Sequence, residues 1–349
     1  MRRRVILALV GAALSTLVTV GPVLACGGLI GPNGAVNLLR TTTFAGYHDG
    51  VEHYVTSFEF AGGEGEFGSL TPLPGVPSSV EKGGDWTLQR LIRETDPVPA
   101  PGLLRLEAAA AGDAEVLMQV RIDALDVTVL KGGAAEVGAW AKANGFRLPA
   151  DAPEVLDFYA RRSPIFLAAV FDADSARERG QQIGDGTPVH VTIPTPNPWV
   201  PLRILALGKA GGERVEADVF LLTDRAPALL PAPNANNGLR LEHSDRASAA
   251  LLDDLRSDRG MEWVPRTAWL MKIAVDGPAS RLSFDLAIDA SGQGAPSRWQ
   301  AGLEPSLRPS DQAPGLATLI LPAAMLVLGI VLVALAPTRR DPGGLAPAA

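Results

Sequence analysis

The chain has 349 residues, a net charge of −7 and a single cysteine. This length is enough for one large domain or two small ones. One cysteine excludes an internal disulfide, and it excludes zinc or iron–sulfur sites built from several cysteines. The acidic balance argues against binding to nucleic acid and against a polybasic role at a membrane surface.

The N-terminal segment over 1–25 has the three parts of a secretory signal peptide. Arginines at 2–4 precede an apolar run over 5–20, and small residues lead to a cleavage point after Ala25. Cleavage there would expose Cys26 as the mature N-terminus, which is the position that carries the lipid in bacterial lipoproteins. Three outcomes stay open: lipidation of Cys26, a plain cut that leaves a free or buried thiol, or an uncleaved anchor.

The first unit after this segment is a predicted β-hairpin. Strand-like stretches over 37–47 and 51–60 flank Asp49-Gly50, a dipeptide that favours a type I′ turn. The turn predicts the cross-strand pairs Tyr47–Glu52, Ala45–Tyr54, Thr43–Thr56 and Thr41–Phe58. With this register Tyr54 lies on the core face, and His53 lies on the other face.

The tip of this hairpin holds the one cluster of histidines and carboxylates in the sequence: His48, Asp49, Glu52 and His53. Two imidazoles and a carboxylate would suit zinc or another divalent cation. His48 and His53 are diagonal neighbours on one face, about 7–8 Å apart at the backbone, whereas Glu52 points to the opposite face. A metal site at His48 and His53 is therefore one hypothesis, and a solvated turn is the alternative.

The remaining elements are mostly strands. Strands are expected at 67–70, 116–122, 126–130, 165–171, 189–193, 202–207, 215–223, 268–275 and 281–288, the last two as a hairpin. Helices are expected after an Asp85 N-cap, at 134–144, from a capping box of Asp151 and Glu154 to about 162, and at 247–256. Strands that outnumber a few short helices indicate an α+β fold with mixed or antiparallel sheets.

Two further features invite a functional interpretation. Trp199 stands in the proline-rich stretch 196–201; exposed on a rigid loop, it could stack on sugars or anchor a protein partner. Packing beneath the loop is the alternative. The run His243-Ser244-Asp245 has the letters of a hydrolase triad, but adjacent residues cannot converge on one reacting atom, and Ser244 or Asp245 suits a helix N-cap. We assign no catalytic residue.

A second apolar segment lies near the C-terminus. Residues 316–335 carry no charge, and Arg339-Arg340 follow them. About twenty residues at about 1.5 Å each cross a hydrocarbon layer of about 30 Å, and arginines beside such spans stay in the cytoplasm. The predicted organisation is a signal peptide at 1–25, an extracytoplasmic domain at 26–310 with a division near 97–113, a transmembrane helix at 316–335 and a short cytoplasmic tail at 336–349.

Several stretches resemble a bacterial family known as domain of unknown function 2330. They are the start at 26–28, the run from Tyr47 to Tyr54 leading into 67–77, and the central part from Asp126 to Val170. The resemblance extends over most of the exported segment. It implies an exported, surface-anchored bacterial protein, and it implies no activity or cofactor.

These observations lead to three hypotheses. The favoured one is a non-enzymatic protein of the cell membrane, spanning it once, whose extracytoplasmic domain binds a cell-envelope component or another surface protein. The second is an envelope hydrolase whose site linear motifs do not reveal. The third is a metal-binding domain at the His48–His53 hairpin. No organic cofactor is expected, because no dinucleotide or phosphate-binding glycine motif is present.

Overall fold

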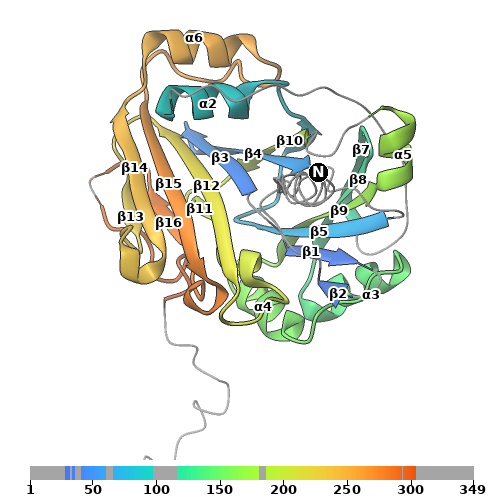
Figure 1. The fold of residues 1–349 in the computed structure, drawn as a ribbon. Coiled ribbons are helices and arrows are strands. Elements are labelled where there is room, and N and C mark those ends of the chain that lie inside the picture. The colour runs from blue at the N-terminus through green and yellow to red at the C-terminus, as the bar shows by residue number, and fades with distance from the viewer. Residues whose placement is uncertain are drawn as a thin grey trace, which may run out of the picture. The chain divides into compact units, whose positions relative to one another are not determined.

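The computed structural model describes residues 28–31, 34–35, 41–59, 66–96, 116–180, 186–292 and 294–303, which belong to one unit of the chain. Its strands form three sheets, with short helices against them (Figure 1). The strand-dominated α+β class is thereby confirmed. Within these ranges no helix is long and apolar enough to cross a membrane. The predictions for the signal peptide, Cys26, the division near 97–113 and the span at 316–335 fall outside them.

The largest sheet has seven strands and is mixed. Its order is β14 (Leu239–Arg246), β15 (Trp269–Pro278), β12 (Arg214–Thr223), β3 (Thr41–His48), β4 (Val51–Glu59), β10 (Gly186–Pro194) and β6 (Ser79–Lys82). Only β12 and β3 run parallel among these neighbours, and the other pairs are antiparallel.

Two smaller sheets are antiparallel throughout. The six-stranded sheet has the order β2 (Gly34–Ala35), β1 (Gly28–Gly31), β5 (Glu66–Leu73), β9 (Ile165–Asp172), β8 (Leu125–Lys131) and β7 (Val116–Ile122). The three-stranded sheet has the order β11 (Trp199–Val200), β16 (Leu286–Asp289) and β13 (Ala228–Leu230).

The hairpin of β3 and β4 has the register that its turn predicted. Tyr47 pairs with Glu52, and Ala45 pairs with Tyr54. Both turn residues have positive φ, 48° at Asp49 and 80° at Gly50, as a type I′ turn requires. Local turn chemistry therefore determined this part of the sheet.

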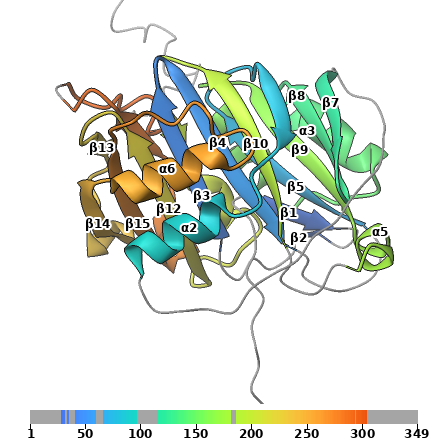
Figure 2. The same cartoon turned by 90° about the horizontal axis from the view of Figure 1, so that it is seen from above.

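The seven-stranded sheet separates two hydrophobic cores. Because side chains alternate between faces along a strand, Tyr54 enters the core shared with the six-stranded sheet, and Val55 enters the second core. The second core lies beneath α2 (Thr87–Thr95) and α6 (Ala249–Ser257), which lie side by side over this outer face (Figures 1 and 2). Their buried leucines, which include Leu91 and Leu255, supply the apolar cover.

The other helices border the first core. They are α3 (Ala134–Ala143), α4 (Ala152–Ala160) and α5 (Ala173–Glu178), together with the 3₁₀ turns η1 (Arg203–Ala206) and η3 (Ala279–Arg281). A third 3₁₀ turn, η2 (Ala235–Asn237), precedes β14 and has no buried residue. Trp140 of α3 and Tyr159 of α4 are fully buried in that core. Both helices were predicted at these places, at 134–144 and from Asp151 to about 162, although the capping box expected at Asp151 does not form.

Several predicted elements are wrong. In these places the structure is decided by contacts between residues that are far apart in the chain. The expected strand at 202–207 is the turn η1, whose first N–H groups donate to the carboxylate of Asp285. The expected hairpin at 268–275 and 281–288 is absent, since β15 and β16 belong to different sheets. His243 to Asp245 lie within β14 rather than before a helix.

Helix caps also differ from the prediction. Helix α6 is capped by Ser248, whose hydroxyl accepts from the N–H of Leu251 at 3.1 Å. No capping bond forms at Asp151, because its carboxylate instead accepts the N–H of Gly208. The start of α2 is capped from far along the chain by Asp258. Sequence spacing alone did not reveal this last cap.

Candidate functional site

The structure separates the two histidines of the hairpin tip. The Nδ1 atom of His48 lies 2.7 Å from the carboxylate of Asp224, which follows β12, and its Nε2 atom lies 3.4 Å from Asp49. His53 instead contacts His190 of β10, with Nδ1 and Nε2 3.0 Å apart. In the ranges that the structure covers, no three or more His, Cys, Asp or Glu side chains are grouped so that they could hold a metal ion.

The His53–His190 pair lies on the outer face of the seven-stranded sheet. Its strands β4 and β10 are hydrogen-bonded neighbours, and both side chains are buried. The indole of Trp263 stacks on His53 with ring centroids 3.9 Å apart and planes 5° apart. Gly46, opposite His53 on β3, leaves room for this indole, since a Cβ there would lie 2.1 Å from it.

The surroundings keep this pair neutral near pH 7. Burial, together with the charges of His190 and His48, lowers the pKa of His53 from 6.5 to about 3. Burial also lowers the pKa of His190, although the carboxylates of Glu81 and Glu262 act in the opposite direction. A neutral imidazole can donate through one nitrogen and accept through the other, which suits the short contact between the rings.

Glu52 lies on the opposite face of the same strand, inside the first core. Its side chain is fully buried, and its carboxylate oxygens make no well-aligned hydrogen bond among the described residues, although the backbone of Trp199 lies close to them. Burial raises the pKa of Glu52 well above its usual value, and the backbone of Trp199 offsets this effect only in part. The protonated, uncharged form of Glu52 is therefore favoured, and its side chain has no surface exposed to solvent.

Trp199 is fully buried, so the exposed position that we considered is wrong and packing beneath the proline-rich loop describes it. Its ring stacks on Tyr159 with centroids 5.8 Å apart, and the guanidinium of Arg162 lies 5.2 Å from its centroid. A tryptophan in this position stabilises the core through packing. As the structure stands, it is not available to bind a sugar or a partner.

Beside Trp199 lies a buried ionic network that the sequence did not reveal. Asp285 accepts hydrogen bonds from Arg162 at 2.6 Å, from the hydroxyl of Tyr159 at 2.8 Å and from the N–H of Leu202 at 2.8 Å. The ion pair is almost completely removed from solvent. The network connects Tyr159 of α4 and the start of η1 to Asp285, which directly precedes β16, and it thereby stabilises the packing of these elements.

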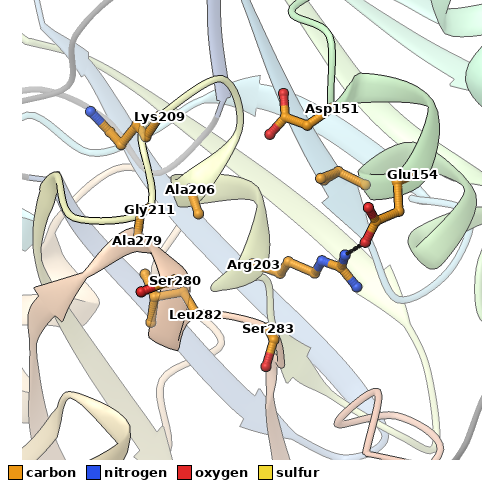
Figure 3. Close-up of a pocket in the computed structure, with 11 residues that line it drawn as sticks. Asp151, Glu154, Arg203, Ala206, Lys209, Gly211, Ala279, Ser280, Leu282 and Ser283 are labelled. Atoms are coloured by element: carbon orange, nitrogen blue, oxygen red, sulfur yellow. Dashed lines mark hydrogen bonds and ion pairs between the residues drawn. The ribbon is translucent and has the colours of Figure 1, made fainter.

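A small cavity of about 210 Å³ lies where α4, η1 and η3 meet (Figure 3). Its charged lining groups have partners within the protein. Arg203 is paired with Glu154, Asp151 accepts the N–H of Gly208, and Lys209 is paired with Glu213 at 2.7 Å. These bonds hold the charged groups of the lining to neighbouring elements, and no cluster of catalytic side chains is seen among the residues that line the cavity.

Sequence reasoning missed His190 and Trp263, the two residues that enclose His53. The alternation of Val189, Val191 and Ile193 places His190 on the face opposite to these apolar residues. Its partner His53 lies 137 positions earlier. The pattern could thus have indicated the face of His190, but it could not have named the partner.

The sequence matches a known protein family over most of its length. A family model described as "Uncharacterized protein conserved in bacteria (DUF2330)" matches residues 23–250. The chain belongs to this family. The matched range includes His53, His190 and the strands that carry them, whereas β15 and β16 follow it. Membership confirms the resemblance seen in the sequence, and the family description names no activity.

No curated protein matches this member of the DUF2330 family significantly. Among solved structures, a mutated baculovirus P35 after caspase cleavage is similar over 72% of this chain and 99% of P35, with 9% identity and a TM-score of 0.40. P35 in a complex with caspase-8 is similar over 72% of this chain and 96% of P35, with 9% identity and a TM-score of 0.37. Such scores are too low to assign a shared fold or activity.

Proposed function

We propose that this DUF2330 protein is anchored in the cell membrane by residues 316–335 and exposes the domain at 26–310 to the extracytoplasmic side, where it binds an envelope component or a surface protein without catalysis. The observation that carries the proposal is the position of the arginines. They precede the apolar run at 5–20 and follow the one at 316–335, so both basic ends favour the cytoplasm.

The arrangement of polar groups in the domain supports a binding role. Among the described residues, three pairs of side chains of the kinds used in catalysis form hydrogen bonds within the pair: His53 with His190, Arg162 with Asp285, and His48 with Asp224. Catalysis by acid, base or nucleophile requires such groups to point at a reacting atom. Here they contribute to the packing of strands and turns.

Protease treatment of intact cells tests the membrane topology. A tag after residue 349 and an antibody against the domain report the two sides of the span. We expect added protease to remove the domain signal and to leave a tagged fragment in the membrane. Deletion of 316–335 should release the protein from the membrane, and a cytoplasmic protein serves as the resistant control. A domain that survives in intact cells but is digested after lysis would contradict the proposal.

Mass spectrometry of the mature N-terminus decides among the three fates of Cys26. A diacylglycerol adduct on Cys26 would show lipidation, an unmodified Cys26 at the N-terminus would show a plain cut, and an intact 1–25 segment would show an uncleaved anchor. If Cys26 is lipidated, the variant Cys26→Ser should lack the lipid adduct. If the signal is removed by a plain cut, the same variant should still be cleaved after residue 25.

Cross-linking in intact cells tests the binding role. We expect a defined cross-linked species that depends on the domain and is lost when only 1–25 and 311–349 are expressed. Absence of a saturable species across cross-linkers of several lengths would argue against a partner. Turnover of an envelope polymer by the purified chain would favour the hydrolase hypothesis instead.

A further inference from the structure

The outer face of the seven-stranded sheet holds a pair of buried histidines beneath a loop. The loop consists of residues 258–268, which join α6 to β15, and we call it the covering loop. Its Trp263 lies flat on His53, whose Nδ1 atom is 3.0 Å from Nε2 of His190. The loop therefore contacts the pair directly.

Close packing leaves the pair little room to adjust. His53 is 9% exposed and His190 is 5% exposed. A Cβ on Gly260 of the covering loop would lie 2.9 Å from Nδ1 of His190, the ring nitrogen that faces away from His53 in the hydrogen-bond pair. Because the loop approaches so closely, the rings cannot turn outward to solvent while it stays in place.

The contact between the rings depends on their protonation. Two imidazoles can share a hydrogen bond only while one of the two facing nitrogens lacks a proton. If both facing nitrogens are protonated, two N–H groups point at each other and two positive charges are buried together, which low polarity makes unfavourable.

We propose that the His53–His190 pair is a proton-sensitive latch that holds the covering loop on the sheet, and that full protonation of the pair releases the loop. The charged and titratable groups that act on the pair are Glu81 of β6, Glu262 of the covering loop and His48 of β3. The two carboxylates favour proton uptake at His190, and His48 disfavours it at His53. Burial outweighs them, as the lowered pKa of each histidine indicates.

Release of the loop would have a second effect, because the loop also caps α2. Asp258, its first residue, accepts hydrogen bonds from the N–H of Asp85, the N–H of Trp86 and the hydroxyl of Thr87. Opening would therefore uncap α2 and expose the second core. This latch is a property of the fold and does not depend on the proposed function.

Hydrogen–deuterium exchange of the full chain in detergent tests the latch. Rates are compared at about pH 7 and about pH 4, above and below the ordinary imidazole pKa of 6.5 that His53 would regain once the loop opens, after correction for intrinsic exchange. We expect exchange in 258–268 and in the first turn of α2 to rise about tenfold or more at the lower pH, because protonation favours the open form. Strands β5 and β9 should keep their protection.

Substitutions identify the groups responsible. His190→Gln keeps a side chain that can hydrogen-bond to His53 but cannot be protonated, so the acid response should fall to less than about a third of its original size. His53→Gln should act in the same way. His243→Gln on β14 removes a histidine outside the pair and should leave the response unchanged.

Three results would overturn the latch. One is equal exchange of the covering loop at both pH values in the unaltered chain, a comparison that needs no variant to fold. Another is a full acid response in both His190→Gln and His53→Gln. The third is simultaneous exchange of the loop and of β5 and β9, which would indicate unfolding of the whole unit.

Discussion

Two adjacent residues of β4 respond to burial in opposite directions. Burial disfavours the charged form, so it raises the pKa of Glu52 and lowers the pKa of His53. The stability that neutral His53 contributes is present above pH 6.5 and is lost as the pH falls toward about 3. The stability that protonated Glu52 contributes is present below its usual pKa of 4.5 and is lost as the pH rises above it.

Replacing Glu52 tests the second of these effects. Glu52→Gln removes the ionisation and keeps the shape of the side chain. We expect the variant to be more stable than the original protein at about pH 8, by about 1 kcal/mol or more, and the gain to shrink at about pH 5. Urea unfolding at the two pH values measures this difference. Glu178→Gln, on the exposed side of α5, should change stability equally at both pH values.

The buried ion pair of Arg162 and Asp285 gives a residue-scale prediction with a larger effect. Asp285→Asn keeps the hydrogen-bonding shape but leaves Arg162 buried without a counter-charge. We expect a loss of about 3–5 kcal/mol in the free energy of unfolding. Asp253→Asn breaks the ion pair with Arg256, in which the aspartate is 73% exposed, and should cost less than about 1 kcal/mol. Equal losses would show that burial does not set the strength of these pairs.

At the scale of elements, α2 depends on a cap that comes from another part of the chain. Its N-cap residue Trp86 provides no side-chain acceptor, and Asp258 lies beyond the end of α6. Because both helices cover the second core, the cap links α2 to the segment that follows α6. A helix that is short and weakly capped on its own is thus held by a distant residue.

Removing this carboxylate should affect α2 more than any other helix. We expect Asp258→Ala to cost about 2 kcal/mol, since three hydrogen bonds to the helix start are lost. Thermal or urea unfolding measures the loss, and hydrogen exchange locates it in 87–91. The matched control is Asp253→Ala in α6. A comparable loss of protection in α2 for the control would contradict the role of Asp258.

At the scale of the whole described unit, edges of the two large sheets meet. Lys82 at the end of β6 forms an ion pair with Asp123, which lies in the turn between β7 and β8 and is nearly buried. Asp123 has a φ of 56°, a conformation that aspartate and asparagine adopt more readily than most residues. The pair therefore joins the seven-stranded sheet to the six-stranded sheet.

A double-mutant cycle measures this connection. Lys82→Gln and Asp123→Asn each remove one charge, and Asp123→Asn preserves the turn. We expect a coupling free energy of about 1 kcal/mol, because the partly buried pair is screened less than a surface pair. Arg214 of β12 and Asp276 of β15 form a more exposed comparison pair, with side chains 64% and 38% exposed, for which a smaller coupling is expected. Additive losses at Lys82 and Asp123 would show that the pair does not couple the sheets.

Sequence reasoning succeeded where neighbours along the chain decide the structure. The Asp49-Gly50 turn determined the register of β3 and β4, and α3 and α4 lie close to the ranges predicted for them. It failed at 202–207, where an apolar run suited a strand but Asp285 holds a 3₁₀ turn. The same limit applies to the candidate site, since His53 was singled out while its partner His190 was not.

By itself the sequence determined family membership, the strand-dominated class, the hairpin register and the face on which each hairpin side chain lies. These properties depend on short-range backbone geometry and on apolar alternation. The tertiary structure decided that Trp199 is buried, that β15 and β16 belong to separate sheets and that His53 meets His190 under Trp263. The physical reason is that these contacts join residues far apart in the chain, and the free energy of burying them together depends on how the whole unit packs.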